Sequence, residues 1–382
     1  MTASVPRRLS LSRSFPRAIA IRPVSFYSEA VTERWLLTAF LTILVPPLAA
    51  SQVPSDPAET FQKFCSACHG TDGTGRTDNL ALATRPMDFT NCSVTTAEPD
   101  IDWHLVIQDG GPIAGLSSQM PAFGDVLDAT QMARLVAFIR SFCTEPGWPS
   151  GNLNFPRPIF TEKAFPENEV VVLPAVLHGA GQEVAARLRA VYERRIGQRA
   201  HVEVGAPLET AGGTPRHTGL GDITVAGKYV LHTDSRSTRL VTGGLEVSLP
   251  TGRSRRGLGA GTTIVEPYLA FGTTILDVYA QTHVKLELPA RRPWAARDLV
   301  YNVYPGRDLS QTGNTWTLGI ELNGVDDHVA VTPQVRKGLT RTGALAVAAG
   351  VRLPVNQRDT HQMRWVGYLL WEYLEPVRAA RD

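Results

Sequence analysis

The chain lacks the features that mark several common classes of protein. Lys and Arg number 38 against 36 Asp and Glu, and a net charge of +2 does not point to nucleic acid as a partner. Beyond residue 52 there is no run of 18 apolar residues, so any membrane crossing there must be made by strands. The sequence has no phosphate-binding loop, no flavin or nicotinamide fingerprint, and no convincing Ser-His-Asp or metal-ligand spacing. We therefore do not expect an enzyme.

The N-terminus has the layout of an export signal. Residues 1–34 carry six arginines, Trp35–Val45 is an apolar run, and small residues follow up to Gln52. This pattern predicts a signal peptide over residues 1–52, cut near Ala50 or Ser51. The unusually long basic region leaves open a start nearer residue 31. An uncleaved anchor helix is the alternative, although the apolar run is shorter than the roughly 20 residues that a spanning helix needs.

Four cysteines are too few for a disulfide scaffold, but two of them belong to a chemical motif. Cys65-Ser-Ala-Cys68-His69 is the C-x-x-C-H pattern of c-type haem attachment. Two thiols at this spacing reach the two vinyl groups on one porphyrin edge, and His69 then becomes the proximal axial ligand. A zinc site would need four closely spaced ligands, and a redox dithiol would not need the histidine. We expect one haem c per chain, bound covalently by Cys65 and Cys68.

Residues 53–144 are predicted to form a small all-α domain around this motif. Asp56-Pro57-Ala-Glu59 is a helix start, and a second helix is plausible over residues 100–108. A third is expected after Asp128, where apolar residues recur at helical spacing: Met132, Leu135, Val136, Ile139 and Phe142. The segment resembles a monohaem cytochrome c whose first and last helices cross. The resemblance covers less than a quarter of the chain.

Such cytochromes commonly take their distal iron ligand from a Met-Pro loop. Met120 begins Met-Pro-Ala-Phe-Gly, 51 residues after His69, and is the expected distal ligand. Met87 is the runner-up, while packing explains Met132. A position left open or filled by His104 is the alternative. Ligation by His and Met fills both axial sites and favours electron transfer over oxygen or peroxide chemistry.

Two cysteines lie outside the haem motif. Cys92 and Cys143 are candidates for a disulfide, because spare thiols often pair in an oxidising compartment. The alternative is two buried free thiols.

The segment after residue 144 is rich in proline. Residues 144–160 hold four prolines and two glycines, which prevent a helix and favour an extended connector. We assign residues 145–167 to a short, semi-rigid linker at the domain boundary.

From about residue 168 the apolar residues alternate with polar ones. Alternation is clear over residues 202–208, 223–231, 241–249, 276–288, 316–322, 345–353 and 362–374. Runs of this length separated by turn residues are typical of membrane β-barrel strands. We expect an antiparallel barrel of about twelve strands over residues 168–376, followed by a tail at 377–382. Histidines on the polar faces are interpreted as hydrated lining of the lumen.

Alternation alone does not tell which face of a strand points inward. A soluble β-sandwich buries the apolar face, whereas a membrane barrel turns it outward. Long strands, opposite charges on the polar faces (Lys285 with Glu287, Arg364 with Glu372) and Trp and Tyr near strand ends favour the membrane barrel. The soluble sandwich stays open as the alternative.

Two short motifs in this region resemble a known family. Thr218-Gly-Leu-Gly-Asp222 with the following Lys228-Tyr229, and Leu249-Pro-Thr-Gly252, are similar to outer-membrane β-barrels named after the meta-pathway of phenol degradation. The resemblance implies an outer-membrane location and passage of small or hydrophobic molecules. Outer-membrane barrels usually end in an aromatic residue, whereas here Tyr373 is followed by nine further residues.

The combined expectation is a multidomain protein with an all-α cytochrome c domain followed by an all-β transmembrane barrel. An even strand count requires a periplasmic N-terminus, so the haem would lie at the inner mouth of an outer-membrane barrel. The partners expected are a periplasmic redox protein and outer-membrane lipid, and the function is electron transfer. The alternative is a pore for a small-molecule solute, with the haem domain as redox sensor, plug or docking module.

Overall fold

The structure is a computed structural model, and it describes residues 53–76, 82–178, 184–211, 215–236, 238–291, 295–356 and 363–373. The predicted signal peptide and the C-terminal tail lie outside the described residues. Among the described residues, no helix is long and apolar enough to cross a membrane.

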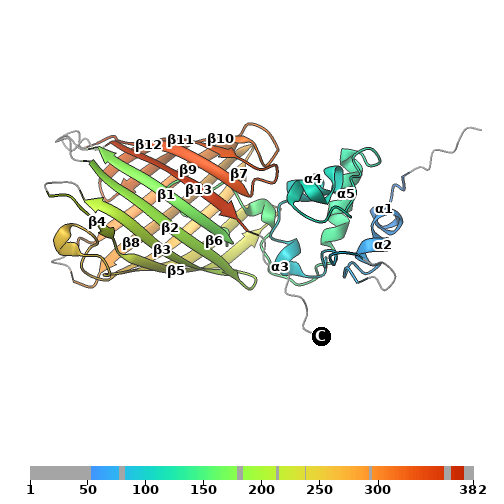
Figure 1. Cartoon of the computed structure of the whole chain (residues 1–382), viewed down its shortest axis with the longest axis horizontal. Coiled ribbons are helices and arrows are strands. Elements are labelled where there is room, and N and C mark those ends of the chain that lie inside the picture. Colours follow the sequence, from blue (N-terminus) through green and yellow to red (C-terminus); the bar gives the residue numbers. More distant parts are fainter. Residues whose placement is uncertain are drawn as a thin grey trace, which may run out of the picture. The chain divides into compact units, whose positions relative to one another are not determined.

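The first part of the chain is helical, as the sequence predicts. Its elements are α1 (Pro57–Phe64), α2 (Ser66–His69), α3 (Cys92–Thr95), α4 (Asp100–Asp109), the 3-10 turn η1 (Gly111–Ala114), α5 (Ala129–Arg140) and the 3-10 turn η2 (Gly151–Leu153) (Figure 1). The predicted helices at residues 57, 100 and 129 are all present.

Side-chain caps explain where α1 and α5 begin. The Asp56 carboxylate accepts the Ala58 N–H at 3.0 Å, and Pro57 supplies a backbone angle that suits the first turn of α1. At α5, Asp128 accepts the Gln131 N–H while the Gln131 side chain accepts the Asp128 N–H. Such a capping box satisfies two donors that a helix end otherwise leaves unpaired.

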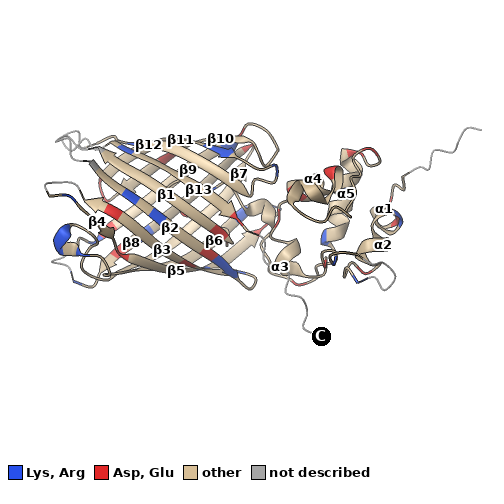
Figure 2. Ribbon diagram, viewed as in Figure 1, with Lys and Arg blue, Asp and Glu red and all other residues tan. Residues whose placement is uncertain are grey.

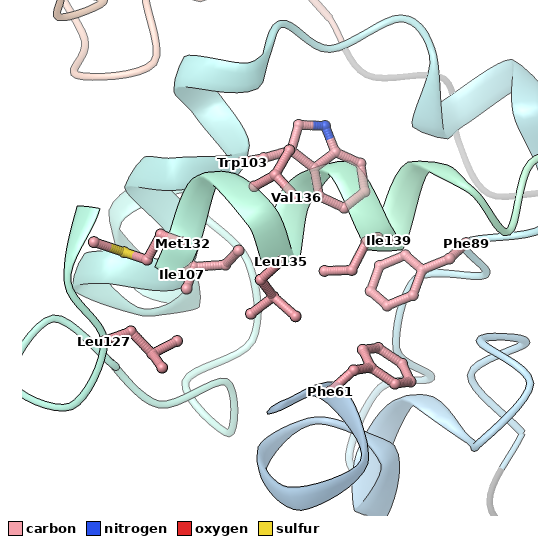
Figure 3. Packing of buried hydrophobic residues seen from close by; sticks show 9 residues of the cluster. All are labelled: Phe61, Phe89, Trp103, Ile107, Leu127, Met132, Leu135, Val136 and Ile139. Carbon is pink, nitrogen blue, oxygen red and sulfur yellow. The ribbon is translucent and has the colours of Figure 1, made fainter. Parts of the chain in front are cut away.

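One hydrophobic cluster holds these helices together. Figure 3 shows its members: Phe61, Phe89, Trp103, Ile107, Leu127, Met132, Leu135, Val136 and Ile139. Leu135 lies near its centre, with Phe61 and Phe89 on one side and Ile107 and Leu127 on the other (Figure 3). The predicted apolar stripe of α5 is confirmed as its buried face, and α5 packs on both α1 and α4.

From Glu169 onward, the described strands form one antiparallel sheet. Its strands are β1 (Glu169–His178), β2 (Val184–Ile196), β3 (Ala200–Ala211), β4 (His217–Leu220), β5 (Ile223–Asp234), β6 (Arg239–Leu249), β7 (Ile264–Ile275), β8 (Val278–Pro289), β9 (Asp298–Asp308), β10 (Trp316–Val325), β11 (His328–Gly338), β12 (Leu345–Pro354) and β13 (Met363–Glu372). The sheet has 13 strands in the described residues.

The sheet closes into a barrel of twelve strand positions. β1 pairs with both β2 and β13, and β2 pairs in turn with β3, so the ring has no free edge among the described strands. β4 and β5 pair with successive parts of β3 and together fill one position, which reduces 13 strands to twelve positions. Figure 1 shows the strands tilted around the barrel axis. The predicted count of about twelve is confirmed.

The barrel turns its apolar face outward. On β10, the side chains of Leu318 and Ile320 are 51% and 46% exposed, whereas those of Glu321 and Asn323 are 0% and 3% exposed. The same arrangement, with apolar side chains exposed and polar ones buried, is found on β3, where Val202 and Val204 are exposed and His201 is buried. A sandwich would bury these apolar residues, so the soluble alternative is wrong and the surface is that of a transmembrane barrel.

One predicted strand begins two residues later than expected. The pattern places Leu276 in a strand, but β7 ends at Ile275 and β8 begins at Val278. Leu276 lies in the connecting turn with φ 56°, a left-handed conformation that no strand residue adopts. The predicted start was wrong because apolar and polar residues alternate through the turn as well, and a two-residue turn does not interrupt a pattern with a period of two.

Candidate haem site and barrel lumen

The haem-binding motif lies at the junction of α1 and α2. The Cys65 N–H donates to the Phe61 carbonyl at 2.8 Å, and the N–H groups of Cys68 and His69 both donate to the Cys65 carbonyl. Cys65 and Cys68 are half-buried and are not joined to another cysteine. The helical turn therefore presents both thiols and His69 from one short segment.

His69 is half-buried and contacts an aromatic ring. Its ring stacks on Phe89, with the ring centroids 4.5 Å apart and the planes 15° apart. Nδ1 of His69 is buried and has no hydrogen-bond partner of good geometry in the described chain. Burial lowers the pKa of His69, and the nearby backbone of Met87 partly opposes that shift. A neutral imidazole is the form that binds iron.

The environment of Cys65 does not favour thiolate chemistry. Burial raises the pKa of the Cys65 thiol to about 11, and the neighbouring Cys68 adds to the shift. Redox dithiols and reactive cysteines instead lie where positive charge lowers the thiol pKa. This agrees with the sequence-based preference for haem attachment over a redox dithiol.

The two methionines proposed for the distal position lie in different surroundings. Met87 packs against the hydrophobic cluster of α1, α4 and α5. Met120 is half-buried and lies outside that cluster, in a loop whose backbone is held on both sides. The Met120 carbonyl accepts the Gly111 N–H at 3.0 Å, and the Met120 N–H donates to the Ser117 carbonyl at 3.2 Å. Packing accounts for Met87 and leaves Met120 available to a ligand.

Gly111 is required for this loop to close. A Cβ atom added at Gly111 would collide with the Ser117 carbonyl oxygen and would lie 3.0 Å from the Met120 Cβ. A larger residue would therefore push the Met120 backbone away from α4.

The other two cysteines form a disulfide in the structure. The Sγ atoms of Cys92 and Cys143 are 1.99 Å apart and the Cα atoms 5.2 Å apart. The bond joins the start of α3 to the segment that follows α5.

Arg140 organises the segment between α3 and α4, a role that the sequence did not suggest. Its guanidinium donates to the Thr95 and Glu98 carbonyls at 2.6 and 2.7 Å, and it forms an ion pair with the Asp100 carboxylate at 2.6 Å. The same carboxylate accepts the Asn152 amide at 2.9 Å. One arginine thus connects α5 with α4 and with the chain entering the barrel.

Two carboxyl groups in this region have shifted pKa values. Burial raises the pKa of Glu98 to about 7, and the Asp102 charge adds to the shift. Burial, together with the charge of Glu372, raises the pKa of Asp102 to about 7. Oδ1 of Asp102 is buried without a hydrogen-bond partner, which agrees with a carboxyl group that is poorly solvated.

Residues 153–168, here called the inner segment, bond to strands on all sides of the barrel and therefore lie in its lumen. Its partners are inward-facing side chains of β1, β2, β3, β5, β6, β8, β9, β10 and β13, among them Glu169, Glu193, His201, Lys228, Thr242, Gln281, Asn302, Glu321 and Tyr368. The sequence predicted an extended connector here but not its position. Proline and glycine content indicates an extended backbone and says nothing about what that backbone contacts.

Glu321 is the main acceptor for the inner segment. Its carboxylate, fully buried on β10, accepts the N–H groups of Ile159, Phe160 and Thr161 at distances of 2.7 to 3.1 Å. The Gln334 side chain on β11 also donates to this carboxylate. A single charged side chain thus satisfies three consecutive backbone donors away from water.

A second set of contacts is ionic. Arg157 pairs with Glu169 at 2.9 Å and with Glu193 at 2.6 Å, and Lys163 pairs with Glu169 at 3.0 Å and with Glu167. Buried ion pairs of this kind hold a defined geometry, because removing one partner leaves an uncompensated charge.

Three buried residues of the lumen lie close enough together to resemble a metal site. Glu193, His201 and Glu203 place one ligand atom each within 4.8 Å of the others. Nδ1 of His201 accepts the Glu167 N–H at 3.0 Å, and Oε1 of Glu193 pairs with the Arg157 guanidinium at 2.6 Å. Nε2 of His201 and Oε2 of Glu193 are buried without a hydrogen-bond partner among the described residues. His201 and His283 were expected to be hydrated lining; both are buried and accept N–H groups of the inner segment instead.

The residues at the α1–α2 junction fit a c-type haem. Two thiols outside any disulfide and the half-buried imidazole of His69 come from one short segment, and the half-buried Met120 lies outside the core. Cys65 and Cys68 would hold the group covalently, and His69 and Met120 would be the axial ligands.

Comparisons with known proteins agree with this division of the chain. The family model described as cytochrome C oxidase, cbb3-type, subunit III matches residues 52–139. No curated protein matches the chain.

Among solved structures, the chain is similar to several outer-membrane barrels at low identity. The KdgM porin in complex with disordered oligogalacturonate is 9% identical at a TM-score of 0.40, covering 54% of this chain and 99% of that one. An outer membrane channel from Pseudomonas putida F1 is 12% identical at a TM-score of 0.42, covering 57% and 100%. The NanC porin is 12% identical at a TM-score of 0.37, covering 54% and 100%. The closed ring and its outward apolar face are seen in the chain's own strands, independently of these likenesses.

Proposed function

We propose that this protein is an electron-transfer protein in which a c-type haem is tethered to the periplasmic side of an outer-membrane β-barrel. The observation that carries the proposal is the α1–α2 turn, which presents Cys65, Cys68 and His69 together beside a compact helical core. The match to a c-type cytochrome family over residues 52–139 supports it.

The haem would supply one-electron chemistry, cycling between ferrous and ferric iron. The chain's own residues do the positioning. The Phe89 ring orients His69, the hydrophobic cluster excludes water from one side of the site, and the loop from Gly111 to Met120 fixes the Met120 backbone. Two protein ligands would leave no open position for a substrate, which suits electron transfer better than oxygen chemistry.

The barrel's part in this proposal is that of an anchor. Its lumen is occupied by the inner segment, whose backbone and charges bond to strands all around the ring. A freely open pore would need that segment to leave. A solute pore remains the second candidate, because the inward faces carry the polar and charged side chains that line a channel.

The proposal is tested with the full chain produced together with a c-type haem maturation system. Washed outer membranes are separated on gels, boiled and unboiled, and stained for haem. We expect a haem-stained band whose mobility shifts on boiling, and we expect the C65A/C68A variant to lose the stain while keeping the shift. Rapid mixing of the purified protein with a small reductant then measures whether the haem is reduced and reoxidised reversibly.

Two outcomes would contradict the proposal. A wild-type band with no haem stain rules out covalent attachment. Solute uptake into vesicles that depends on the haem oxidation state, with no electron exchange to a protein partner, would favour the pore.

A further inference from the structure

One end of the barrel carries a cluster of exposed arginines. Six arginines from three neighbouring loops form this cluster, which we call the basic rim: Arg216, Arg253, Arg255, Arg256, Arg291 and Arg297. Part of the basic rim is seen in Figure 2 as the blue ribbon of the 3-10 turn η3 (Ser254–Arg256). This turn belongs to the loop after β6 and is drawn near the label of β4. All six side chains are exposed, and among the described residues none forms an ion pair.

The loops that carry the rim are connected to one another. Leu258, in the loop after β6, is buried against Gly219 of β4, where an added Cβ would lie 3.0 Å from the Leu258 side chain. The Arg291 N–H donates to Thr262 at 3.2 Å, and the Ala290 N–H donates to the Thr263 carbonyl at 2.8 Å. The arginines therefore belong to one surface rather than to separate loops.

The longest of these loops is held in a defined conformation by Asp222. Its two carboxylate oxygens accept the Gly252 N–H at 2.9 Å and the Ala260 N–H at 2.7 Å. The nearby Glu209 pairs with Arg187. Neither carboxylate forms an ion pair with an arginine of the basic rim.

Some arginines at the opposite end of the barrel have partners within the chain. There Arg307 pairs with Asp277 at 3.5 Å, Arg341 pairs with Asp109 at 2.5 Å, and Arg199 donates to the Gly147 carbonyl at 2.9 Å. Three positive charges at that end therefore have partners within the chain, although the exposed Arg194, Arg236 and Arg239 form no ion pair among the described residues. The basic rim differs in that none of its six arginines forms an ion pair among the described residues.

The rim begins where the apolar belt of the barrel ends. Leu220 of β4 and Leu249 of β6 are exposed, and Arg216 and Arg253 each lie four residues away along the chain toward the loops. Both arginines therefore lie on the loop side of the belt, next to the zone where the head groups of the lipids are found. Arginine binds phosphate through two parallel hydrogen bonds, and clusters of four to eight basic residues at a membrane surface are typical of anionic-lipid binding.

We propose that the basic rim binds the phosphate groups of phosphorylated lipids in the leaflet opposite the haem domain. The inference goes beyond electron transfer and requires only that the barrel spans a membrane. The haem proposal and this one can therefore fail separately.

The test uses the full-length haem-containing protein in a neutral detergent. Its affinity is measured for a bisphosphorylated glycolipid in mixed micelles and for the same glycolipid after enzymatic removal of both phosphates. We expect the phosphorylated form to bind at least about tenfold more tightly, and R253Q/R255Q/R256Q to lose about tenfold of that affinity. A second variant, R216Q/R291Q/R297Q, is expected to show a similar loss.

A matched control removes the same charge from the other end of the barrel. R194Q/R236Q/R239Q changes three exposed arginines there and is expected to leave the affinity within about twofold. Heat-dependent gel mobility and haem content verify that every variant is folded.

Three results would overturn the proposal. Equal losses in the control and the rim variants would indicate unspecific charge attraction. Equal binding of the two glycolipids would exclude phosphate recognition. Displacement of the glycolipid by inorganic phosphate or by a soluble polyanion at equal phosphate concentration would assign the rim to a soluble ligand.

Discussion

At the scale of single residues, the candidate haem site depends on which side chains the hydrophobic core leaves unused. Phe61, Phe89 and Leu135 have no polar group and are explained by packing. His69 and Met120 are not explained in that way, because neither belongs to that cluster. The contrast between Met87 and Met120 leads directly to a measurement.

Met120→Ala is expected to lower the reduction potential of the haem by on the order of 0.1 V, because loss of a thioether ligand favours ferric iron. Met87→Leu is the matched control and is expected to change the potential much less, since Met87 contributes packing. A spectroelectrochemical titration of the full chain measures both. A large shift in M87L together with an unchanged potential in M120A would assign the distal position to Met87.

Asp102 leads to a prediction of pH dependence. Its pKa of about 7 in the folded protein lies above the value of about 3.9 in an unfolded chain, so the folded state binds the proton more tightly. The contribution of Asp102 to the free energy of unfolding therefore falls as the pH rises from about 4 to about 7. Asp102→Asn is expected to stabilise the haem domain by on the order of 1 kcal/mol at pH 8 and by little at pH 4.5.

Loss of the haem absorption band on heating measures this stability in the full chain. Asp125→Asn is the control, because Asp125 is exposed and has no partner among the described residues. An equal gain for D102N at both pH values would show that the Asp102 carboxyl group does not titrate as stated.

At the scale of elements, the inner segment is the feature that most alters the expected organisation. It has the composition of a linker but the contacts of a core element, since Glu321 alone accepts the N–H groups of three of its residues. Backbone donors removed from water need such acceptors, because an unsatisfied buried donor costs about 1–3 kcal/mol.

Glu321→Ala is expected to destabilise the barrel by about 3 kcal/mol or more, because three buried N–H groups lose their acceptor. Glu209→Gln is the control; its partner Arg187 is exposed, and such pairs contribute about 0.2–1 kcal/mol. The temperature at which gel mobility shifts in neutral detergent measures both. Equal midpoints for E321A and the wild type would mean that the inner segment does not hold this position in the membrane protein.

At the scale of the whole molecule, the closed ring decides what the outer surface contacts. Ile320 lies at the middle of β10 and faces outward. Ile320→Arg is expected to reduce the stability of the membrane-inserted barrel by about 2–4 kcal/mol, because a guanidinium at mid-depth loses its hydration. Leu276→Arg is the control, since Leu276 lies in the turn between β7 and β8.

Urea unfolding of the barrel in lipid vesicles measures this difference. Similar unfolding curves for I320R and L276R would mean that the outward face of β10 is not in contact with lipid.

Much of the fold follows from patterns that are local in sequence. Asp56 and Asp128 mark helix starts because their carboxylates bond within three residues, and the α5 stripe is read from one turn to the next. Strand alternation is equally local, so the number of barrel strands was predictable. The haem motif is local as well, because its two thiols and its histidine must meet one haem from within five residues.

The sequence could not place the residues whose partners are far away along the chain. Arg140 meets Thr95 and Glu98, over forty residues earlier, and nothing in the composition of α5 marks it. The shifted pKa of Asp102 depends on burial and on Glu372, which only the folded chain brings near. The basic rim is spread over three loops that become one surface only when the strands close.

By itself, the sequence determined the chemistry of the haem motif, the helix limits and the two-residue alternation, since each arises from contacts within a few residues. The tertiary structure alone decided which strand face points outward and where the proline-rich segment lies. Closure of the ring decides which strand face points outward. Before β13 pairs with β1, either face of an alternating strand could be the buried one. Contacts such as that between Ile159 and Glu321 set the second, because residues 162 positions apart meet only inside a completed barrel.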